Sequence, residues 1–295
     1  MNLHPYLMLI RPANIVTAMS DILAGAAISG YFFELNTPSL LNLIFLLLST
    51  SCLYAGGIVF NDIFDLDIDR TERPERPLPR GQVSLKNARF FGITLLLTGI
   101  LLSFLSHVES GFIAIFIALS ALLYDRYTKD FLVIGPLNMG ICRGLNLMLG
   151  MSILSISTHP HLIWICLIPV IFIAAITLTS KGEVLGNNTS ALVMALALDV
   201  AVTGLLVGIG ILGWMDIWMS GPFIVLWIGM NGKAKLKAIV KNNPKFIKVA
   251  VKMGVLSLIP LNASYVAGFG HWGLGLGTLL LLPISLGLAK RFSVT

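Results

Sequence analysis

The sequence predicts an all-α protein: a polytopic membrane helix bundle with nine or ten transmembrane helices around a central cavity open to the cytoplasmic face. Its composition supports this fold class, because 56% of the 295 residues are hydrophobic and only 12% are charged. A soluble globular domain carries roughly 25% charged residues. The apolar stretches run for about 17–25 residues without strict alternation, which is typical of membrane-spanning helices and not of barrel strands.

We expect a single domain, residues 1–295, in which ten apolar segments are candidate membrane spans. Acidic segments follow the second and the sixth span on the same face. This spacing suggests two pseudo-repeated four-helix halves, at about residues 10–130 and 131–245, followed by C-terminal helices. The ten expected spans cover about residues 13–33, 39–61, 87–106, 110–125, 132–155, 161–180, 189–213, 216–232, 247–268 and 272–290.

Lysine and arginine residues gather in alternate loops, which sets the expected orientation. Seven lysines lie between Lys233 and Lys252 alone. The positive-inside rule places these basic loops and both termini in the cytoplasm. The loops that lack lysine and arginine cover residues 34–37, 107–110, 157–160, 214–216 and 270–272.

The formal net charge of +6 is therefore interpreted as a topology signal. We expect the lipid bilayer, and no nucleic acid, as the partner of this surface. The expected location is a cell inner membrane or an intracellular membrane such as a thylakoid, with the acidic motifs on the cytoplasmic side.

A stripe of acidic residues marks the end of the second expected span. At about 100° per residue, Asn61, Asp62, Asp65 and Asp69 share one helical face about 100° wide, whereas Asp67 points away. Like charges on one face repel each other, so the stripe needs a compensating cation. Oxygen-only ligands suit a hard ion, and we expect Mg²⁺.

Magnesium is usually bound through one or two carboxylates together with waters and phosphate oxygens. The sequence therefore predicts a phosphorylated substrate at the acidic stripe. An alternative stays open: the stripe is a solvated helix end that neighbouring arginines neutralise.

The loop after the stripe is stiff, because three prolines restrict its backbone between Thr71 and Gly81. It carries Arg73, Arg76 and Arg80, whose guanidinium groups match phosphate oxygens. Ser84 is expected to cap the third span.

Polar residues inside the spans point to the expected cavity, because intramembrane charges usually face the bundle interior and pair there. In the first expected span, Thr17 lies on the same helical stripe as Asn14 and Asp21. We expect Arg143 to pair with Asp21 or with Asp199, as either a structural or a catalytic pair. The residues expected to line the pocket are Asn14, Asp21, Tyr54, Arg143 and Asn146.

These motifs resemble those of the UbiA family of intramembrane prenyltransferases. That family carries N-D-x-x-D-x-x-x-D after its second span, which Asn61, Asp62, Asp65 and Asp69 match. Its following D-x-x-x-x-R-P-L-P-x-G stretch is similar to residues 76–81 over the R-P-L-P-x-G part. The family also has a tyrosine and a basic residue after the fourth span; Tyr124, Arg126 and Lys129 are similar. The likeness covers the first seven spans and fades over the last 80 or so residues.

The resemblance implies an enzyme that transfers a prenyl group from a prenyl diphosphate to an aromatic or lipophilic acceptor, with Mg²⁺ assisting ionisation of the allylic diphosphate. The implied catalytic residues are Asp62, Asp65, Asp69 and Lys129. The implied metal ligands are Asn61, Asp62, Asp65, Asp69, Glu183 and Asn187. The implied diphosphate-binding residues are Arg76, Arg126, Lys129 and Lys181.

One departure from the family pattern keeps a non-catalytic alternative open. The family usually has D-x-x-x-D after its sixth span, where this chain has Glu183 and Asn187. The second site therefore loses one charge, which is compatible with a homologue that binds a prenyl diphosphate without turnover. A transporter is a further alternative, although its acidic residues would lie near the bilayer midplane.

Overall fold

The computed structural model describes residues 3–33, 37–154, 156, 160–181, 186 and 188–292. Within these ranges every regular element is helical, which confirms the all-α prediction. The first half contains α1 (His4–Ile10), α2 (Pro12–Ile28), the short η1 (Tyr31–Phe33), α3 (Thr37–Phe64), α4 (Leu66–Glu72), α5 (Leu85–Ser106), α6 (Val108–Leu123) and the π-helix η2 (Tyr124–Thr128).

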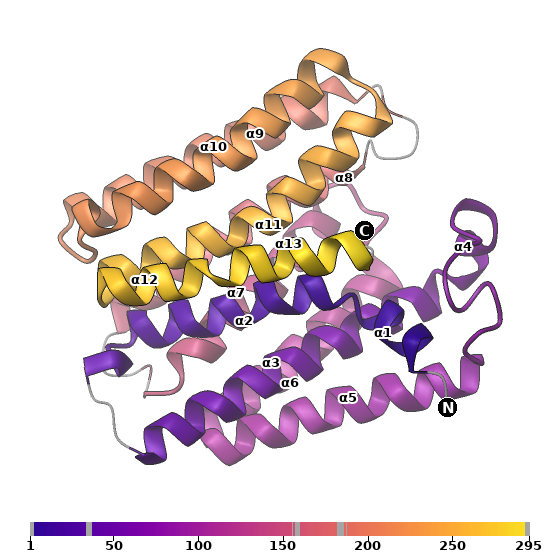
Figure 1. Ribbon diagram of the computed structural model, residues 1–295, viewed down its shortest axis with the longest axis horizontal. Helices are drawn as coiled ribbons and strands as arrows, with labels where there is room; N and C mark the ends of the chain where they lie inside the picture. Colours follow the sequence, from indigo (N-terminus) through magenta and orange to yellow (C-terminus); the bar gives the residue numbers. More distant parts are fainter. Residues whose placement is uncertain are drawn as a thin grey trace.

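The second half continues the bundle. It contains α7 (Ile134–Met151), η4 (Pro160–Cys166), α8 (Leu167–Ser180), α9 (Thr189–Ile211), α10 (Ile217–Lys241), α11 (Pro244–Phe269), α12 (Trp272–Leu279) and α13 (Leu281–Arg291). The long helices run side by side along the molecule, with α9 and α10 at one edge and α3, α5 and α6 at the other (Figure 1).

A helix occurs at each of the ten expected spans, but the expected number of nine or ten transmembrane helices is not confirmed. In the described part of the chain, seven helices are long and apolar enough to cross a bilayer. They become eight if α1 and α2, bent by 48° at Arg11, form one span. The segments expected at 132–155 and 216–232 form α7 and α10, which do not meet that standard.

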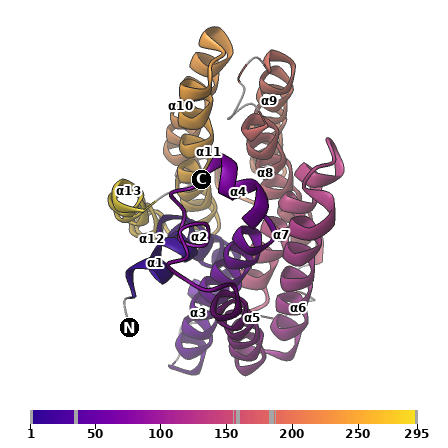
Figure 2. The same cartoon turned by 90° about the vertical axis from the view of Figure 1, so that its right-hand side faces the viewer.

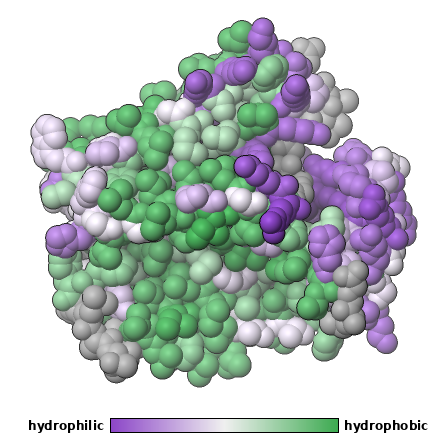
Figure 3. All heavy atoms as spheres, viewed as in Figure 1, coloured by the Kyte–Doolittle hydropathy of each residue, from purple (hydrophilic) through white to green (hydrophobic). Residues whose placement is uncertain are grey.

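The surface agrees with an integral multi-pass membrane protein. Apolar atoms cover most of the body, and hydrophilic atoms gather at the end where α4 and the turn between α10 and α11 lie (Figures 1 and 3). At this end Ser84 is the N-cap residue before α5, and its hydroxyl oxygen accepts a 3.2 Å hydrogen bond from the backbone N–H of Asn87. The predicted cap is thereby confirmed.

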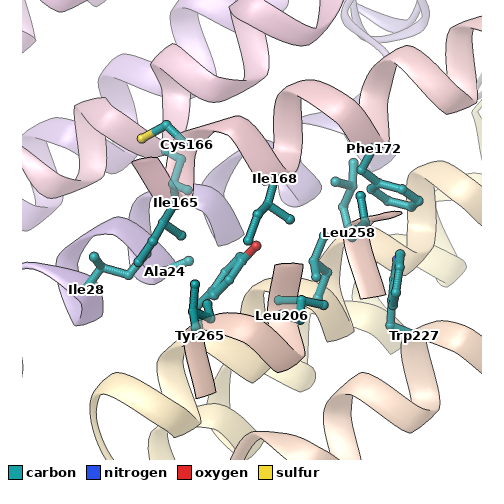
Figure 4. Packing of buried hydrophobic residues seen from close by; sticks show 14 of the residues in the cluster. Ala24, Ile28, Ile165, Cys166, Ile168, Phe172, Leu206, Trp227, Leu258 and Tyr265 are labelled. Atoms are coloured by element: carbon teal, nitrogen blue, oxygen red, sulfur yellow. The ribbon is translucent and has the colours of Figure 1, made fainter. Parts of the chain in front are cut away.

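Two helices, α2 and α7, stand in the middle of the bundle (Figure 2). They cross closely because a Cβ atom at Gly25 would overlap the carbonyl oxygen of Leu147, and one at Gly150 would overlap that of Ile22. Both helices contribute to the two largest apolar clusters. The larger cluster includes Ala24 from α2 together with Ile168, Phe172, Trp227 and Tyr265 from the helices beside it (Figure 4).

Candidate active site

The acidic stripe keeps its predicted register across a change of helix. Although α3 ends at Phe64 and α4 begins at Leu66, the helical hydrogen bonds continue from Asp65 N to Asn61 O at 2.9 Å and from Asp69 N to Asp65 O at 2.8 Å. Asp62 and Asp69 are buried. Asp67 instead points outward, where its side chain is 90% exposed and contacts Arg70.

Each carboxylate of the stripe contacts a basic side chain from another segment. Arg11, at the bend between α1 and α2, places Nη2 2.5 Å from Asp62 Oδ1. Arg76, from the proline-rich loop, places Nη1 2.6 Å from Asp69 Oδ2 and 3.2 Å from Asp62 Oδ1. Lys129, after the π-helix, contacts Asp65 Oδ1 through Nζ. Three chain segments therefore bring positive charge to one helical face.

Arg76 keeps one buried donor available. Among the residues that the structure describes, its Nη2 atom has no hydrogen-bond partner. A buried guanidinium N–H without an acceptor is unfavourable, and an anionic oxygen is the acceptor that suits it best. Arg73 of the same loop lines the cavity below. These positions fit a site for a phosphate group.

Asn61 connects the stripe to a second buried carboxylate. Its Nδ2 donates a 2.9 Å hydrogen bond to Asp125 Oδ1, which leaves the amide oxygen as the atom that can face a cation. Asp125 is buried and lies in the π-helix η2, a type of turn that is frequent at functional sites. The first acidic motif therefore offers carboxylate and amide oxygens.

This donor set fits Mg²⁺. No group of three or more His, Cys, Asp or Glu side chains forms a ready metal cage in the described ranges. Magnesium rarely uses such a cage, because it is usually held by one or two carboxylates together with waters and substrate phosphates. Asp62, Asp65 and Asn61 could supply those protein oxygens. Glu183 and Asn187, predicted as further ligands, lie outside the described residues.

A partly open cavity of about 280 Å³ begins at the stripe and continues into the bundle. Its mouth includes Arg11, Asn61 and Asp125. Beyond the mouth, α8 and α11 supply a mostly apolar wall, with Thr177 and Ser180 as its polar members, whereas α2, α3 and α7 supply most of the polar groups. The apolar wall contains Ile173, Ile176, Val251, Val255 and Leu258, and the polar wall contains Asn14, Thr50, Tyr54, Arg143 and Asn146.

The expected pairing of Arg143 with Asp21 is confirmed, with Nε 2.5 Å from Asp21 Oδ2. Asn146 donates to the same Asp21 oxygen at 2.8 Å. Asp21 lies behind this wall and is absent from the lining of the cavity in the described part of the protein. The alternative pairing with Asp199 is wrong, because Asp199 contacts Lys235 at 2.5 Å.

The remaining predicted phosphate-binding residues have contacts with groups outside the stripe. Arg126 is exposed and stacks 5.8 Å from the ring centre of Phe64. Lys181 donates to the Phe131 carbonyl oxygen at 3.0 Å. Arg80 borders a separate pocket with His4 and Tyr6. Roles for Arg126 and Lys181 in binding diphosphate stay predictions.

Burial affects the two lysines of the predicted set in the same direction. Desolvation lowers the pKa of Lys129, although the charge of Asp130 acts to raise it. Desolvation also lowers the pKa of Lys181, again opposed by Asp130. Burial disfavours the charged form of an ammonium group.

Sequence reasoning did not identify several contributors to the site. Arg11 counted only as a topology signal, and Asp125 was not singled out. Asn262 of α11 donates a 2.6 Å hydrogen bond to Asp21 Oδ1 across more than 200 residues. The position of Asp125 at the end of an apolar span was the one available signal, because Arg11 and Asn262 lie far from their partners in the sequence.

The fold and the site together define a class: an integral membrane helix bundle that presents acidic and basic groups at the mouth of an intramembrane cavity. A model of the UbiA prenyltransferase family matches residues 22–245. The chain belongs to the UbiA prenyltransferase family.

Proteins similar to this chain include archaeal enzymes named digeranylgeranylglyceryl phosphate synthase. The one from Sulfurisphaera tokodaii is 29% identical over 209 residues, which cover 68% of this chain and 72% of that protein. The one from Methanocaldococcus jannaschii is 37% identical over 142 residues, 48% of this chain and 49% of that protein. The one from Methanosphaera stadtmanae is 30% identical, with 50% of this chain and 52% of that protein covered. The chain spans about half the length of most of these relatives.

Solved structures show the same fold. A UbiA homologue from Aeropyrum pernix has a TM-score of 0.70 at 18% identity, covering 90% of this chain and 98% of that one. A UbiA homologue from Archaeoglobus fulgidus bound to GPP and Mg²⁺ has a TM-score of 0.63 at 16% identity, covering 97% of this chain and 99% of that one.

Proposed function

We propose that this chain transfers a prenyl group from a prenyl diphosphate to a lipophilic acceptor, with Mg²⁺ as the cofactor. The observation that carries the proposal is the geometry of the cavity mouth. Three carboxylates on one helical face each contact a cation, and Asn61 of the same face lines a cavity with a mostly apolar wall. A prenyl diphosphate has the matching shape, a charged head on a long apolar tail.

The basic residues of the mouth have a clear role in this reaction. Arg76 and Lys129 would bind oxygens of the diphosphate, and their positive charge would stabilise the negative charge that grows as the allylic carbon–oxygen bond breaks. Bound Mg²⁺, held by Asp62, Asp65 and Asn61, would neutralise further charge on the same leaving group. The apolar wall would hold the tail and keep water from the allylic cation.

The acceptor then completes the transfer. An acceptor hydroxyl oxygen bonds to the allylic carbon and loses its proton, and diphosphate leaves. Among acceptors, we propose a lipid alcohol: a glyceryl phosphate that already carries one geranylgeranyl chain. The names of the similar archaeal enzymes support this choice, because their product has two such chains on glyceryl phosphate.

Diphosphate release from purified protein in lipid nanodiscs tests the proposal. The donor is geranylgeranyl diphosphate, and the acceptors are geranylgeranylglyceryl phosphate and, for comparison, an aromatic carboxylic acid. We expect Mg²⁺-dependent release and an ether product with the lipid alcohol, both lost on chelation with EDTA. Asp62→Asn and Asp65→Asn should each lower the rate by about 100-fold or more.

Asp67→Asn is the matched control, because it removes one charge from the same segment without touching the stripe. Tight Mg²⁺-dependent donor binding without release would contradict turnover and favour the non-catalytic homologue. Absence of donor binding would contradict both the transferase and the non-catalytic homologue. Transfer to the aromatic acid alone would contradict the lipid acceptor.

A further inference from the structure

We infer that Arg143 and the polar wall around it form the head-group subsite for the acceptor. In this subsite, guanidinium and amide groups bind oxygen atoms of the acceptor, while the apolar wall holds the prenyl chain. The inference rests on the proposed function and goes further, because it assigns the second substrate to one wall of the cavity.

The cavity is divided by chemistry. The charged and amide groups Arg143 and Asn146 lie with Tyr54 on the side built by α3 and α7, whereas the side built by α8 and α11 is mostly apolar and has no polar groups other than the hydroxyls of Thr177 and Ser180 among the described residues. A prenyl chain has no group that can use hydrogen-bond donors. If the cavity held only that chain, a charged guanidinium and an amide would not be expected in its wall, because such side chains inside a membrane protein are unfavourable unless they serve a purpose.

Arg143 is held in a fixed position. Its Nη2 atom donates to the Thr17 carbonyl oxygen at 2.6 Å, and its Nε atom contacts Asp21. Tyr54 places its ring centre 5.7 Å from the guanidinium carbon. A donor that is held this way loses little freedom when it binds a ligand, which is the requirement for a specific subsite.

The groups behind Arg143 are themselves fixed. Asp21 accepts hydrogen bonds from Asn146 at 2.8 Å and from Asn262 at 2.6 Å. Thr50 donates to Asn146 Oδ1 at 2.7 Å. Four helices, α2, α3, α7 and α11, therefore support one network.

The positively charged end of the network is the end that faces the cavity. Arg143 lines the cavity, whereas its partner Asp21 lies behind it, outside the lining formed by described residues. The pair has no net charge, but its positive end is nearer to the ligand. Electron-rich oxygens, such as those of a hydroxyl or a phosphate group, are the atoms that this end attracts.

The depth of the subsite suits the reaction. Tyr54 precedes Asn61 by seven residues on α3, which is about 10 Å along a helix. The diphosphate would occupy the mouth, and the allylic carbon would lie just below it. An acceptor head bound at Arg143 and Tyr54 would then lie below that carbon, with room for a hydroxyl to reach it.

Separate measurement of acceptor and donor affinity tests the inference. The variant Asp21→Asn/Arg143→Gln removes both charges and places a neutral amide at each position, so it leaves no buried charge unpaired. Arg143→Lys keeps the charge and is a second, milder variant. The probes are geranylgeranylglyceryl phosphate, geranylgeranylglycerol and geranylgeranyl diphosphate.

For the double variant we expect the Kd and KM for the acceptor to rise about 10- to 100-fold, while the Kd for the donor stays within twofold. Loss with both acceptors would mean that Arg143 binds a glycerol oxygen, and loss with the phosphorylated acceptor alone would mean that it binds the phosphate. Unchanged acceptor affinity, or equal loss for donor and acceptor, would overturn the inference.

The matched control is Asp199→Asn/Lys235→Gln, which makes the same change of charge in a buried pair away from the cavity and should leave acceptor affinity unchanged. Failure of the inference differs from failure of the proposed function. Wild-type transfer together with normal acceptor affinity in the Arg143 variants would overturn only the subsite. Absence of both donor binding and transfer in the wild-type protein would overturn the proposed function, and the subsite with it.

Discussion

Two buried ion pairs in this molecule have nearly the same chemistry and different surroundings. Arg143 and Asp21 join α7 to α2, and Lys235 and Asp199 join α10 to α9, each with a nitrogen–oxygen distance of 2.5 Å. In both pairs an asparagine also donates to the carboxylate, as Asn231 does to Asp199 at 2.8 Å. The pairs differ in access: Arg143 lines the cavity, and neither Lys235 nor Asp199 belongs to the lining that the described residues form.

The comparison shows that a buried charge inside a membrane protein is not enough to assign function. Both pairs satisfy the expectation that intramembrane charges pair within the bundle. The two pairs differ in their contact with a cavity, and this difference matters because a side chain can bind a ligand only where the ligand can reach it. We therefore expect the Lys235 pair to affect stability alone and the Arg143 pair to affect stability and acceptor binding.

The largest expected effect follows from breaking the Lys235 pair. Lys235→Met leaves the Asp199 carboxylate buried without its cation, so the free energy of unfolding should fall by about 3–5 kcal/mol. Thermal denaturation in detergent measures this loss. Donor and acceptor affinity per folded molecule should stay unchanged, and a selective loss of either affinity would mean that this pair also serves the site.

A smaller effect is expected where α2 and α7 cross. Gly25→Ala adds a methyl group against the Leu147 carbonyl oxygen, and overpacking of this kind destabilises by about 1–3 kcal/mol. The substitution would also shift Asp21 relative to Arg143. Stability and acceptor affinity should both fall, as measured by denaturation and binding.

Gly204→Ala is the control on α9, the helix that carries Asp199. A Cβ atom there meets no described atom within 4 Å, and alanine favours a helix by about 0.5–1 kcal/mol over glycine. If Gly204→Ala also destabilised the protein, the loss of stability in Gly25→Ala would not be evidence for the close crossing of α2 and α7.

Replacing both members of the Lys235 pair should have little effect. Asp199→Asn/Lys235→Gln removes both charges and leaves an acceptor for Asn231, so we expect stability within about 1 kcal/mol of the wild-type protein. The same double replacement at Asp21 and Arg143 should also preserve folding. A double Lys235 variant as unstable as Lys235→Met would indicate that the charges, rather than their pairing, stabilise α9 against α10.

The smallest effect is expected at Asp67. Its exposed pair with Arg70, at 2.8 Å, should contribute less than about 0.5 kcal/mol to stability. Asp67→Asn should therefore fold and release diphosphate like the wild-type protein. A large loss of release would show that charge in this segment matters more than the register of the stripe.

Much of this architecture could be predicted from local patterns. Helical periodicity placed Asn61, Asp62, Asp65 and Asp69 on one face because the backbone hydrogen bonds remain helical through the break at Asp65. The apolar segments also predicted helices at the correct places, because a run of apolar residues is a local pattern. Features that depend on neighbours in the sequence could therefore be predicted.

The partner of each charge was harder to predict, because it depends on how the helices pack. Lys235 was grouped with the flanking lysines, since the expected span ended at residue 232. In the structure α10 continues to Lys241 and buries Lys235 one turn after Asn231. The burial of Asn231, Lys235 and Ala238 on one face is a helical pattern, but the surrounding lysines conceal it.

Arg11 has two roles that affect how variants of the site should be designed. It holds Asp62, and its backbone adopts the left-handed conformation, with φ of 46°, at the bend between α1 and α2. Alanine at this position would remove the guanidinium group and keep a Cβ atom that disfavours this φ, so it would bear the same conformational cost of about 1 kcal/mol that arginine already bears. Glycine adopts the same φ freely. Arg11→Gly would therefore combine the loss of the guanidinium group with relief of this cost, and Arg11→Ala is the substitution that isolates the contribution of the side chain.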